Sequence, residues 1–368
     1  MLKRFAVINF RGFAEKLTWN LANPGNYEFN DFSVRDGVVK NGIIYGRNGS
    51  GKSNLGLAVF DIVNHLSHKM KKTDYYDTFT YVGAINSPVR FEYSFQLGNN
   101  TVDYSYAKVK NGRMVEERLL VDGKQVFYLK SKALFEIDEE QFPIEKSLKE
   151  SLKNNANNVS VVNYLISSFP LSMNHYLLRL QSFVENMLWF RCLEVREFIG
   201  FESEVTLIEQ FIIKKRLIDD FASFLKDVSG QEFTFVNPSP SPDMLFCKIG
   251  NEQVLFQKII STGTRSLELF YLWLRKTLDK ASLVFIDEFD AFYHFELSYG
   301  VCRNLFQMPC QAFVTTHNTF LMTNDLLRPD CNFVLKNNRI QPLCELTDKE
   351  LRQANNIEKL YRGGAFES

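Results

Sequence analysis

The sequence predicts an α/β protein with a mixed or parallel core sheet, an antiparallel β meander and an inserted helical subdomain. Three observations predict this fold class. A glycine-rich loop joins an apolar strand at 42–45 to a helical pattern at 53–68. Residues 89–129 alternate with the period of β-strands. Apolar strands at 282–286 and 311–316 are bounded by helical patterns, which is typical of a parallel sheet buried on both faces.

The N-terminal domain is expected to span residues 1–130. It begins with two strands, 2–10 and 16–22, which meet at a tight corner at Arg11 and Gly12. The short strand, the glycine-rich loop and its helix follow, and the meander completes the domain. The turns of the meander are expected at 98–100, 111–112 and 122–123.

Residues 131–230 lack strand alternation and are rich in Leu, Lys, Glu and Phe, so we expect an insertion of several helices there, with a break at 154–158. A C-terminal domain, 231–368, would begin with strands between 232 and 258. Helices near 264–279 and 295–307 then flank its two apolar strands.

Composition limits the possible functions. The chain of 368 residues has 43 basic and 43 acidic residues, which argues against a protein coated in positive charge for non-specific nucleic-acid binding. Residues 1–115 carry 15 basic and 9 acidic residues, which leaves room for one basic face. The six cysteines form no Cys-x-x-Cys pair, as in cytosolic proteins with reduced thiols. No apolar run approaches the roughly 18 residues of a membrane span, so we expect a cytoplasmic protein with no membrane partner.

The segment GRNGSGKS fits the phosphate-loop pattern G-x-x-x-x-G-K-[ST]. Its glycines would let backbone N–H groups surround phosphate oxygens, while Lys52 reaches the β- and γ-phosphates and Ser53 binds Mg²⁺. A coincidental glycine-rich turn is the alternative, but the strand before the loop and the helix after it favour a nucleotide site. The residues expected to contact the nucleotide are Gly46, Arg47, Asn48, Gly49, Ser50, Gly51, Lys52, Ser53 and Asn54.

Two carboxylates follow the apolar strand LVFI. The strand would deliver Asp287 to the carboxyl edge of the sheet, where ligands bind in α/β proteins, and Asp287 would hold Mg²⁺ through water. Glu288 would polarise the water that attacks the γ-phosphate. A strand that simply ends in solvated acids is the alternative interpretation.

Two further segments have open interpretations. His317 closes the strand that ends in Thr315 and Thr316, where it could contact a γ-phosphate or be structural. The turn at 261–264 precedes an amphipathic helix and could be a helix cap or a second anion cradle.

Together, the segments GRNGSGKS, ISTGT, LVFIDE and TTH resemble, in this order, the ABC-type ATPases of the SMC/RecF/OLD superfamily. The chain is more closely similar to the compact AAA-family ATPases of bacterial phage-defence loci. INFRGF is similar to their NFRSF motif, and FDAFYHF to their E-x-x-LHP stretch. The segments TTHNTFLMTNDLLRPD and NIEKLYRGGAF are similar to the C-terminus of the compact members.

The resemblance implies a second half of the nucleotide site. Ser261 and Gly263 would occupy the signature positions, which in ABC enzymes contact the γ-phosphate held by the other subunit. A homodimer that sandwiches two ATP molecules is therefore implied. The segment ISTGT departs from the familiar LSGGQ at Thr262 and Thr264.

The resemblance also assigns roles to single residues. His317 would be the switch histidine, and His294 would lie in the loop that links the two sites or in an interface or core. Arg11 would approach the phosphates, or it is a surface arginine at a strand corner. Gln96 is a candidate for the glutamine loop and hence for a metal contact.

These expectations lead to one favoured function and two alternatives. The favoured function is an Mg²⁺-dependent ATPase whose ATP-dependent dimerisation gates a separate effector, a nuclease or toxin, in anti-phage defence. The 51 residues after His317 are too few for the nuclease domain of the OLD enzymes. The alternatives are a DNA-binding repair or recombination ATPase of the RecF type and a scaffold that binds nucleotide but barely turns it over. Glu288 argues against the scaffold.

Overall fold

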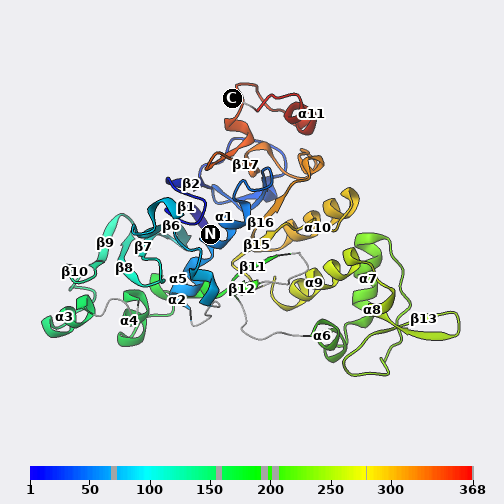
Figure 1. Ribbon diagram of the computed structural model, residues 1–368, viewed down its shortest axis with the longest axis horizontal. Coiled ribbons are helices and arrows are strands. Elements are labelled where there is room, and N and C mark those ends of the chain that lie inside the picture. The colour runs from blue at the N-terminus through cyan, green and yellow to red at the C-terminus, as the bar shows by residue number, and fades with distance from the viewer. Residues whose placement is uncertain (68–72, 155–159, 192–197, 201–206, 279, 367–368) are drawn as a thin grey trace.

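The computed structural model describes residues 1–67, 73–154, 160–191, 198–200, 207–278 and 280–366. Two seven-stranded sheets form its centre, and helices surround them (Figure 1). The predicted α/β class, with a meander and a largely parallel core sheet, is confirmed.

The first sheet is antiparallel throughout and has the order β10-β9-β8-β7-β6-β1-β2. Every second side chain of β6 is buried, which explains its period of two. Asp122 and Gly123 both have positive φ, as the two-residue turn of a twisted hairpin requires. The strands are β1 (Leu2–Ile8), β2 (Leu17–Asn20), β6 (Val89–Leu97), β7 (Asn100–Lys108), β8 (Met114–Val121), β9 (Lys124–Lys130) and β10 (Leu134–Ile137).

The second sheet has the order β12-β11-β15-β16-β5-β17-β18. Its five inner strands are parallel and its two edge strands antiparallel. All residues of β5, β15 and β16 are buried, as expected for strands covered on both faces. The strands are β5 (Asn41–Tyr45), β11 (Met187–Arg191), β12 (Phe198–Gly200), β15 (Leu283–Asp287), β16 (Gln311–Thr316), β17 (Asn332–Lys336) and β18 (Arg339–Pro342).

The helix predicted at 53–68 is two short helices, because the chain turns after Val59. The helices predicted near 264–279 and 295–307 are confirmed as α9 and α10. The helices are α1 (Lys52–Val59), α2 (Asp61–Leu66), α3 (Lys146–Asn154), α4 (Val161–Ser168), α5 (Tyr176–Glu185), α6 (Ile208–Lys214), α7 (Ile218–Ser229), α8 (Phe256–Ile259), α9 (Thr262–Lys276), α10 (Phe295–Gln307) and α11 (Ile357–Arg362). Two small hairpins pair β3 (Val34–Arg35) with β4 (Val38–Val39) and β13 (Phe246–Ile249) with β14 (Glu252–Leu255).

The expectation that 131–230 is entirely helical is wrong. The segment contains β10, β11 and β12, and β11 lies inside the core sheet next to β15. Its helices also divide between two places: α5 packs on α2 and β6, whereas α6 and α7 pack on α9 (Figure 1). The predicted break at 154–158 lies almost entirely outside the described residues.

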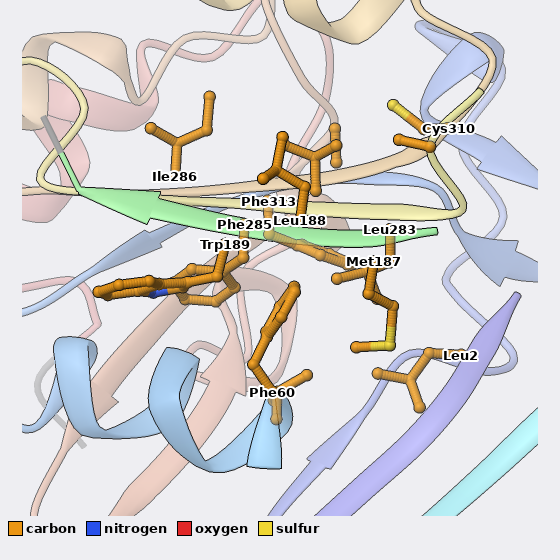
Figure 2. Packing of buried hydrophobic residues seen from close by; sticks show 14 of the residues in the cluster. Leu2, Phe60, Met187, Leu188, Trp189, Leu283, Phe285, Ile286, Cys310 and Phe313 are labelled. Carbon is orange, nitrogen blue, oxygen red and sulfur yellow. The ribbon is translucent and has the colours of Figure 1, made fainter. Parts of the chain in front are cut away.

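Aromatic side chains fill the space between α1 and the parallel sheet. Figure 2 shows Phe60 extending from the end of this helix toward Phe285, and their ring centroids lie 6.5 Å apart. Gln311 links the two sheets: its amide accepts from Leu2 N at 2.8 Å and donates to the carbonyls of Leu2 and Val39. These contacts fix β1, and hence the corner that follows it, relative to the core sheet.

The cysteines of the described residues form no disulfide bonds. Five cysteines are free, and four of them are buried, while Cys192 lies outside the described residues. Among the described residues, no group of three or more His, Cys, Asp and Glu side chains is arranged to hold a metal ion. No helix in the described part of the chain is both long and apolar enough to span a bilayer.

Candidate functional site

The loop from Gly46 to Ser53 connects β5 to α1 and depends on its glycines. A Cβ at Gly46 would lie 2.4 Å from Ser50 Oγ and 2.8 Å from the Leu335 carbonyl oxygen. Gly49 and Gly51 have φ angles of 78° and 101°, a region that favours glycine. The loop is therefore held in a tight conformation that side chains at these positions would disrupt.

The loop has the features of an anion cradle. Helix α1 begins at Lys52, and Gly51 before it has no side chain with which to cap the first turn. Backbone N–H groups at an uncapped helix start, together with the helix dipole, attract anions. Ser50 Oγ is buried and has no hydrogen-bond partner among the described residues. These polar groups fit a bound phosphate.

Lys52 links the loop to His317. Its Nζ donates to the carbonyl oxygens of Gly46 at 2.8 Å and Arg47 at 3.3 Å. It also lies 3.1 Å from Nε2 and 3.3 Å from Nδ1 of His317. Burial lowers the pKa of Lys52, and the nearby carboxylates of Asp287 and Glu288 raise it. The structure thus brings together the predicted lysine, histidine and acidic pair.

Asp287 and Glu288 are joined by one hydroxyl. Thr315 Oγ1 donates to Asp287 Oδ1 at 2.8 Å and accepts from the Glu288 backbone N–H at 2.8 Å. Asp287 is fully buried at the carboxyl end of β15. Glu288 has a φ of 49°, so the chain turns sharply as it leaves the strand. The pair is therefore part of an ordered site rather than a solvated strand end.

Sequence reasoning missed Arg191, the last residue of β11. The parallel register places it beside Asp287, and its Nε lies 3.0 Å from Asp287 Oδ2. The sequence does contain a signal for it: Arg191 directly follows the apolar run MLWF, as Asp287 directly follows LVFI.

Asp290 is a second residue that the sequence analysis missed. The hydroxyl of Thr316 donates to both carboxylate oxygens of Asp290, at 2.8 and 2.7 Å, and accepts from the Asn318 backbone N–H at 2.8 Å. Burial raises the pKa of Asp290. These bonds tie the loop that carries His317 to the turn that follows Glu288.

Arg11 lies at a corner that packs against the phosphate loop. A Cβ on Gly12 would lie 3.4 Å from the side chain of Asn54, and a Cβ on Gly51 would lie 2.9 Å from the ring of Phe13. The Arg11 guanidinium lies over the ring of Tyr75, 5.4 Å from its centroid. The corner that carries Arg11 therefore packs on the loop and on Asn54, and an approach of Arg11 to the phosphates stays a prediction.

Gln96 does not join this group. It lies near the end of β6 that pairs with the start of β1, whereas Arg11 follows the other end of β1. Its side-chain amide donates to the carbonyls of Gly98 and Asn100, and its oxygen accepts from Lys3. The prediction of Gln96 as a metal contact is wrong, because β6 turns toward β7 there and not toward the loop.

Ser261 and Gly263 lie in the lobe formed by α6, α7, α8 and α9, apart from the start of α1 (Figure 1). Ser261 caps α9 by accepting from Thr264 N at 3.1 Å, so the turn is a helix cap, and a second role as an anion cradle stays a prediction. A Cβ at Gly263 would lie 2.9 Å from the Phe292 carbonyl oxygen, in the turn after Glu288. Ser261 is exposed.

His294 precedes α10 and is exposed. Its Nε2 lies 3.8 Å from a carboxylate oxygen of Glu296. His294 is therefore not a core histidine. A place in the loop that links the two nucleotide sites, or in an interface, stays a prediction.

A family comparison matches the segment of the chain that contains the candidate site. Residues 43–323 match the family described as "AAA domain, putative AbiEii toxin, Type IV TA system". The chain belongs to this family of AAA domains. The matched segment of this AAA domain includes the phosphate loop, both carboxylates and His317, and it confirms the resemblance to AAA-family ATPases. No curated protein matches the chain significantly in sequence.

Solved structures with a similar overall course of the chain include three proteins. One is an SMC head bound to the C-terminal winged-helix domain of ScpA (14% identity, TM-score 0.45, covering 92% of this chain and 96% of that one). Another is the SMC head domain from Thermotoga maritima (13%, 0.43, 93% and 98%). The third is the recombination mediator RecF with ATP (14%, 0.41, 93% and 99%).

Proposed function

We propose that this AAA domain binds ATP with Mg²⁺ at the loop Gly46–Ser53 and hydrolyses it in the cytoplasm. The observation that carries the proposal is the convergence of Lys52, the Asp287–Glu288 pair and His317 at one edge of the parallel sheet. Ser53 and Asp287 would hold the Mg²⁺, Asp287 through water. When bound, Mg²⁺ supplies positive charge that stabilises the phosphates during transfer.

Glu288 is the proposed general base. Glu288 is the first residue after the buried Asp287. Its backbone N–H donates to the Thr315 hydroxyl, and its φ of 49° turns the chain away from β15. His317 contacts Lys52 and would sense the occupant of the loop. Arg11, at the neighbouring corner, would approach the phosphates.

The proposed active form is a homodimer. Ser261 and Gly263 lie in a different lobe from the loop of the same chain, so a second protomer would present them to the nucleotide. The start of α9 is exposed and therefore accessible to such a partner. Two nucleotides would then be sandwiched between two protomers.

The proposed role of dimerisation is to gate a separately encoded effector in anti-phage defence. The family description refers to a toxin–antitoxin system, and this supports an action together with a second protein. The effector would be a nuclease or a toxin that responds to the ATP-bound dimer.

The decisive experiment compares Glu288→Gln with the wild type by mass measurement in Mg²⁺ and ATP. Removal of the base should trap the dimer and abolish hydrolysis, whereas Lys52→Ala should remain monomeric because it no longer holds the phosphates. A Glu288→Gln protein that stays monomeric with saturating ATP would contradict the dimer proposal.

The same preparation tests the alternative of a RecF-type DNA ATPase. Hydrolysis by the wild type is measured with duplex, gapped and single-stranded DNA at two salt concentrations. A rate that DNA stimulates, and that salt then suppresses, would favour the alternative. A rate indifferent to DNA supports an effector-gating role.

A further inference from the structure

Arg191 forms an ion pair with the carboxylate that the proposed function assigns to Mg²⁺. Its Nε lies 3.0 Å from Asp287 Oδ2, and its guanidinium lies 5.5 Å from the centroid of the Trp189 ring. Residues 187–191 and 283–287 are neighbouring parallel strands, so this contact is built into the register of the core sheet.

Both oxygens of Asp287 are already engaged. Oδ1 accepts from Thr315 and Oδ2 accepts from Arg191, while the residue itself is inaccessible to solvent. A buried carboxylate requires hydrogen bonds and an opposite charge. The guanidinium of Arg191 supplies that charge.

Mg²⁺ and the Arg191 guanidinium therefore compete for the negative charge of the Asp287 carboxylate. Mg²⁺ and its bound waters are drawn to carboxylate oxygens that carry an uncompensated negative charge. A guanidinium on Oδ2 cancels this charge and occupies one of the two oxygens. With Arg191 in place, the attraction of the site for Mg²⁺ is reduced.

We propose that Arg191 is an internal counter-ion of Asp287. Its ion pair with the Asp287 carboxylate must break before Mg²⁺ can bind with nucleotide. The proposal rests on the proposed function, since it takes the loop as a nucleotide site. Arg191 stabilises the site while it lacks Mg²⁺ and sets the Mg²⁺ concentration at which nucleotide is captured. Arg191 is thus a positioning residue and not a catalytic one.

The test measures binding of a fluorescent ATP analogue to the full chain as Mg²⁺ is titrated. Arg191→Gln removes the charge and should lower the half-saturating Mg²⁺ concentration by about fivefold or more, the usual size of coupling between two ligands. Arg191→Lys keeps the charge and should remain near the wild-type value.

A matched control is available in α9. Arg275 makes a similar but more exposed pair, with its Nε 2.7 Å from Asp220 Oδ2, its Nη2 2.7 Å from Asp220 Oδ1 and its guanidinium 5.5 Å from the Tyr271 centroid. Arg275→Gln should leave the Mg²⁺ dependence unchanged. An equal shift in both variants would overturn the proposal, because it would reflect a general loss of stability.

Thermal unfolding gives a second readout. Without Mg²⁺ and nucleotide, Arg191→Gln should melt at a lower temperature than the wild type, and saturating Mg²⁺ and ATP analogue should recover the loss. If Arg191→Gln does not fold, Arg191→Met keeps the contact with Trp189 and carries the same expectations.

Three outcomes are distinguishable. An unchanged half-saturating Mg²⁺ concentration with weaker nucleotide affinity would show that the guanidinium binds phosphate directly, and would overturn the proposal. A Mg²⁺ shift that persists in an Asp287→Asn background would also overturn it. Failure of the wild type to bind the analogue at any Mg²⁺ concentration would instead refute the proposed function and, with it, the basis of this inference.

Discussion

The hydroxyl of Thr315 bridges the two acidic residues of the site, and its removal is a sharp test of how far catalysis depends on it. Thr315→Val keeps the shape of the side chain but leaves Asp287 Oδ1 and the Glu288 N–H without this partner. We expect a loss of about 1–3 kcal/mol in the free energy of unfolding, the usual cost of an unsatisfied buried polar group. The rate of ATP hydrolysis should fall as well, because Glu288 loses its anchor.

Urea denaturation and a steady-state hydrolysis assay measure the two effects. Thr315→Ser retains the hydroxyl and should stay close to the wild type in both. Normal hydrolysis by Thr315→Val would show that the bridge does not position Glu288.

His65 makes stability depend on pH. Its Nε2 is inaccessible to solvent and its ring stacks on Tyr106, with 4.0 Å between centroids. Burial, and to a lesser degree the charge of Lys108, lowers the pKa of His65 well below its usual 6.5. A depressed folded-state pKa means that the unfolded chain binds the extra proton, so stability is lost as pH falls below 6.5.

His65→Phe removes this titration and keeps an aromatic ring on Tyr106. Between pH 6.5 and 5, the slope of unfolding free energy against pH should become shallower by up to about 1.4 kcal/mol per pH unit, the value for one proton. Chemical denaturation at several pH values measures the slope. Parallel curves for the two proteins would contradict the assignment.

Elements with a clear period were predictable from sequence, and β11 was not. The alternation of β6 and the helical spacing of α10 gave correct boundaries to within a few residues. The run MLWFR is buried along four of its five positions, so no period distinguishes it from part of a buried helix. Because β11 was missed, Arg191 was missed with it.

The site was predictable where its residues lie within one short sequence motif. The phosphate loop, Asp287 and Glu288 follow from short motifs, whereas the contacts of Thr315 and Arg191 depend on which strands are neighbours. Gln96 shows the same limit: it lies near the end of a strand as expected, but that end of β6 pairs with the start of β1 and turns into β7, away from the corner at Arg11.

The packing of α1 on the core sheet leaves no room for a side chain at Gly56. A Cβ there would lie 2.7 Å from both the Phe285 ring and Trp189 Nε1. Gly→Ala ordinarily favours a helix by about 1 kcal/mol. Overpacking costs about 1–3 kcal/mol, so Gly56→Ala should destabilise the fold.

Gly300 in α10 provides the matched control. A Cβ there would meet only the Val228 carbonyl oxygen, at an ordinary 3.6 Å. Gly300→Ala should therefore raise the melting temperature while Gly56→Ala lowers it. The same sign for both changes in a thermal unfolding assay would show that packing of α1 is not limiting.

At the scale of the whole molecule, the candidate site is assembled from parts that are distant in sequence. The core sheet contributes the phosphate loop, Asp287 and His317, and the antiparallel sheet contributes the corner at Arg11. Helix α9 lies apart from the start of α1 (Figure 1), so in the proposed nucleotide sandwich the start of α9 would reach the loop of a second chain.

Thr262 offers a test of that assembly which leaves the fold intact. It is exposed and is the first residue of α9. At this position the helix dipole attracts an acidic side chain, which stabilises the helix by about 0.3–1 kcal/mol. In a nucleotide sandwich, however, a carboxylate at this position would face the phosphates held by the partner. At about 4 Å, two like charges near a protein surface repel by about 4 kcal/mol, which outweighs the gain in the helix.

Thr262→Glu, introduced into the Glu288→Gln protein, should therefore abolish the ATP-dependent dimer without lowering the melting temperature. Binding of a fluorescent ATP analogue to the monomer should be unchanged, because α9 lies apart from the start of α1 (Figure 1). Mass measurement with Mg²⁺ and ATP detects the dimer, and Thr262→Gln, which has the same size without the charge, should still form it. If the Glu variant dimerises as well as the Gln variant, the start of α9 does not face the nucleotide of the partner, and the two protomers must meet through another surface.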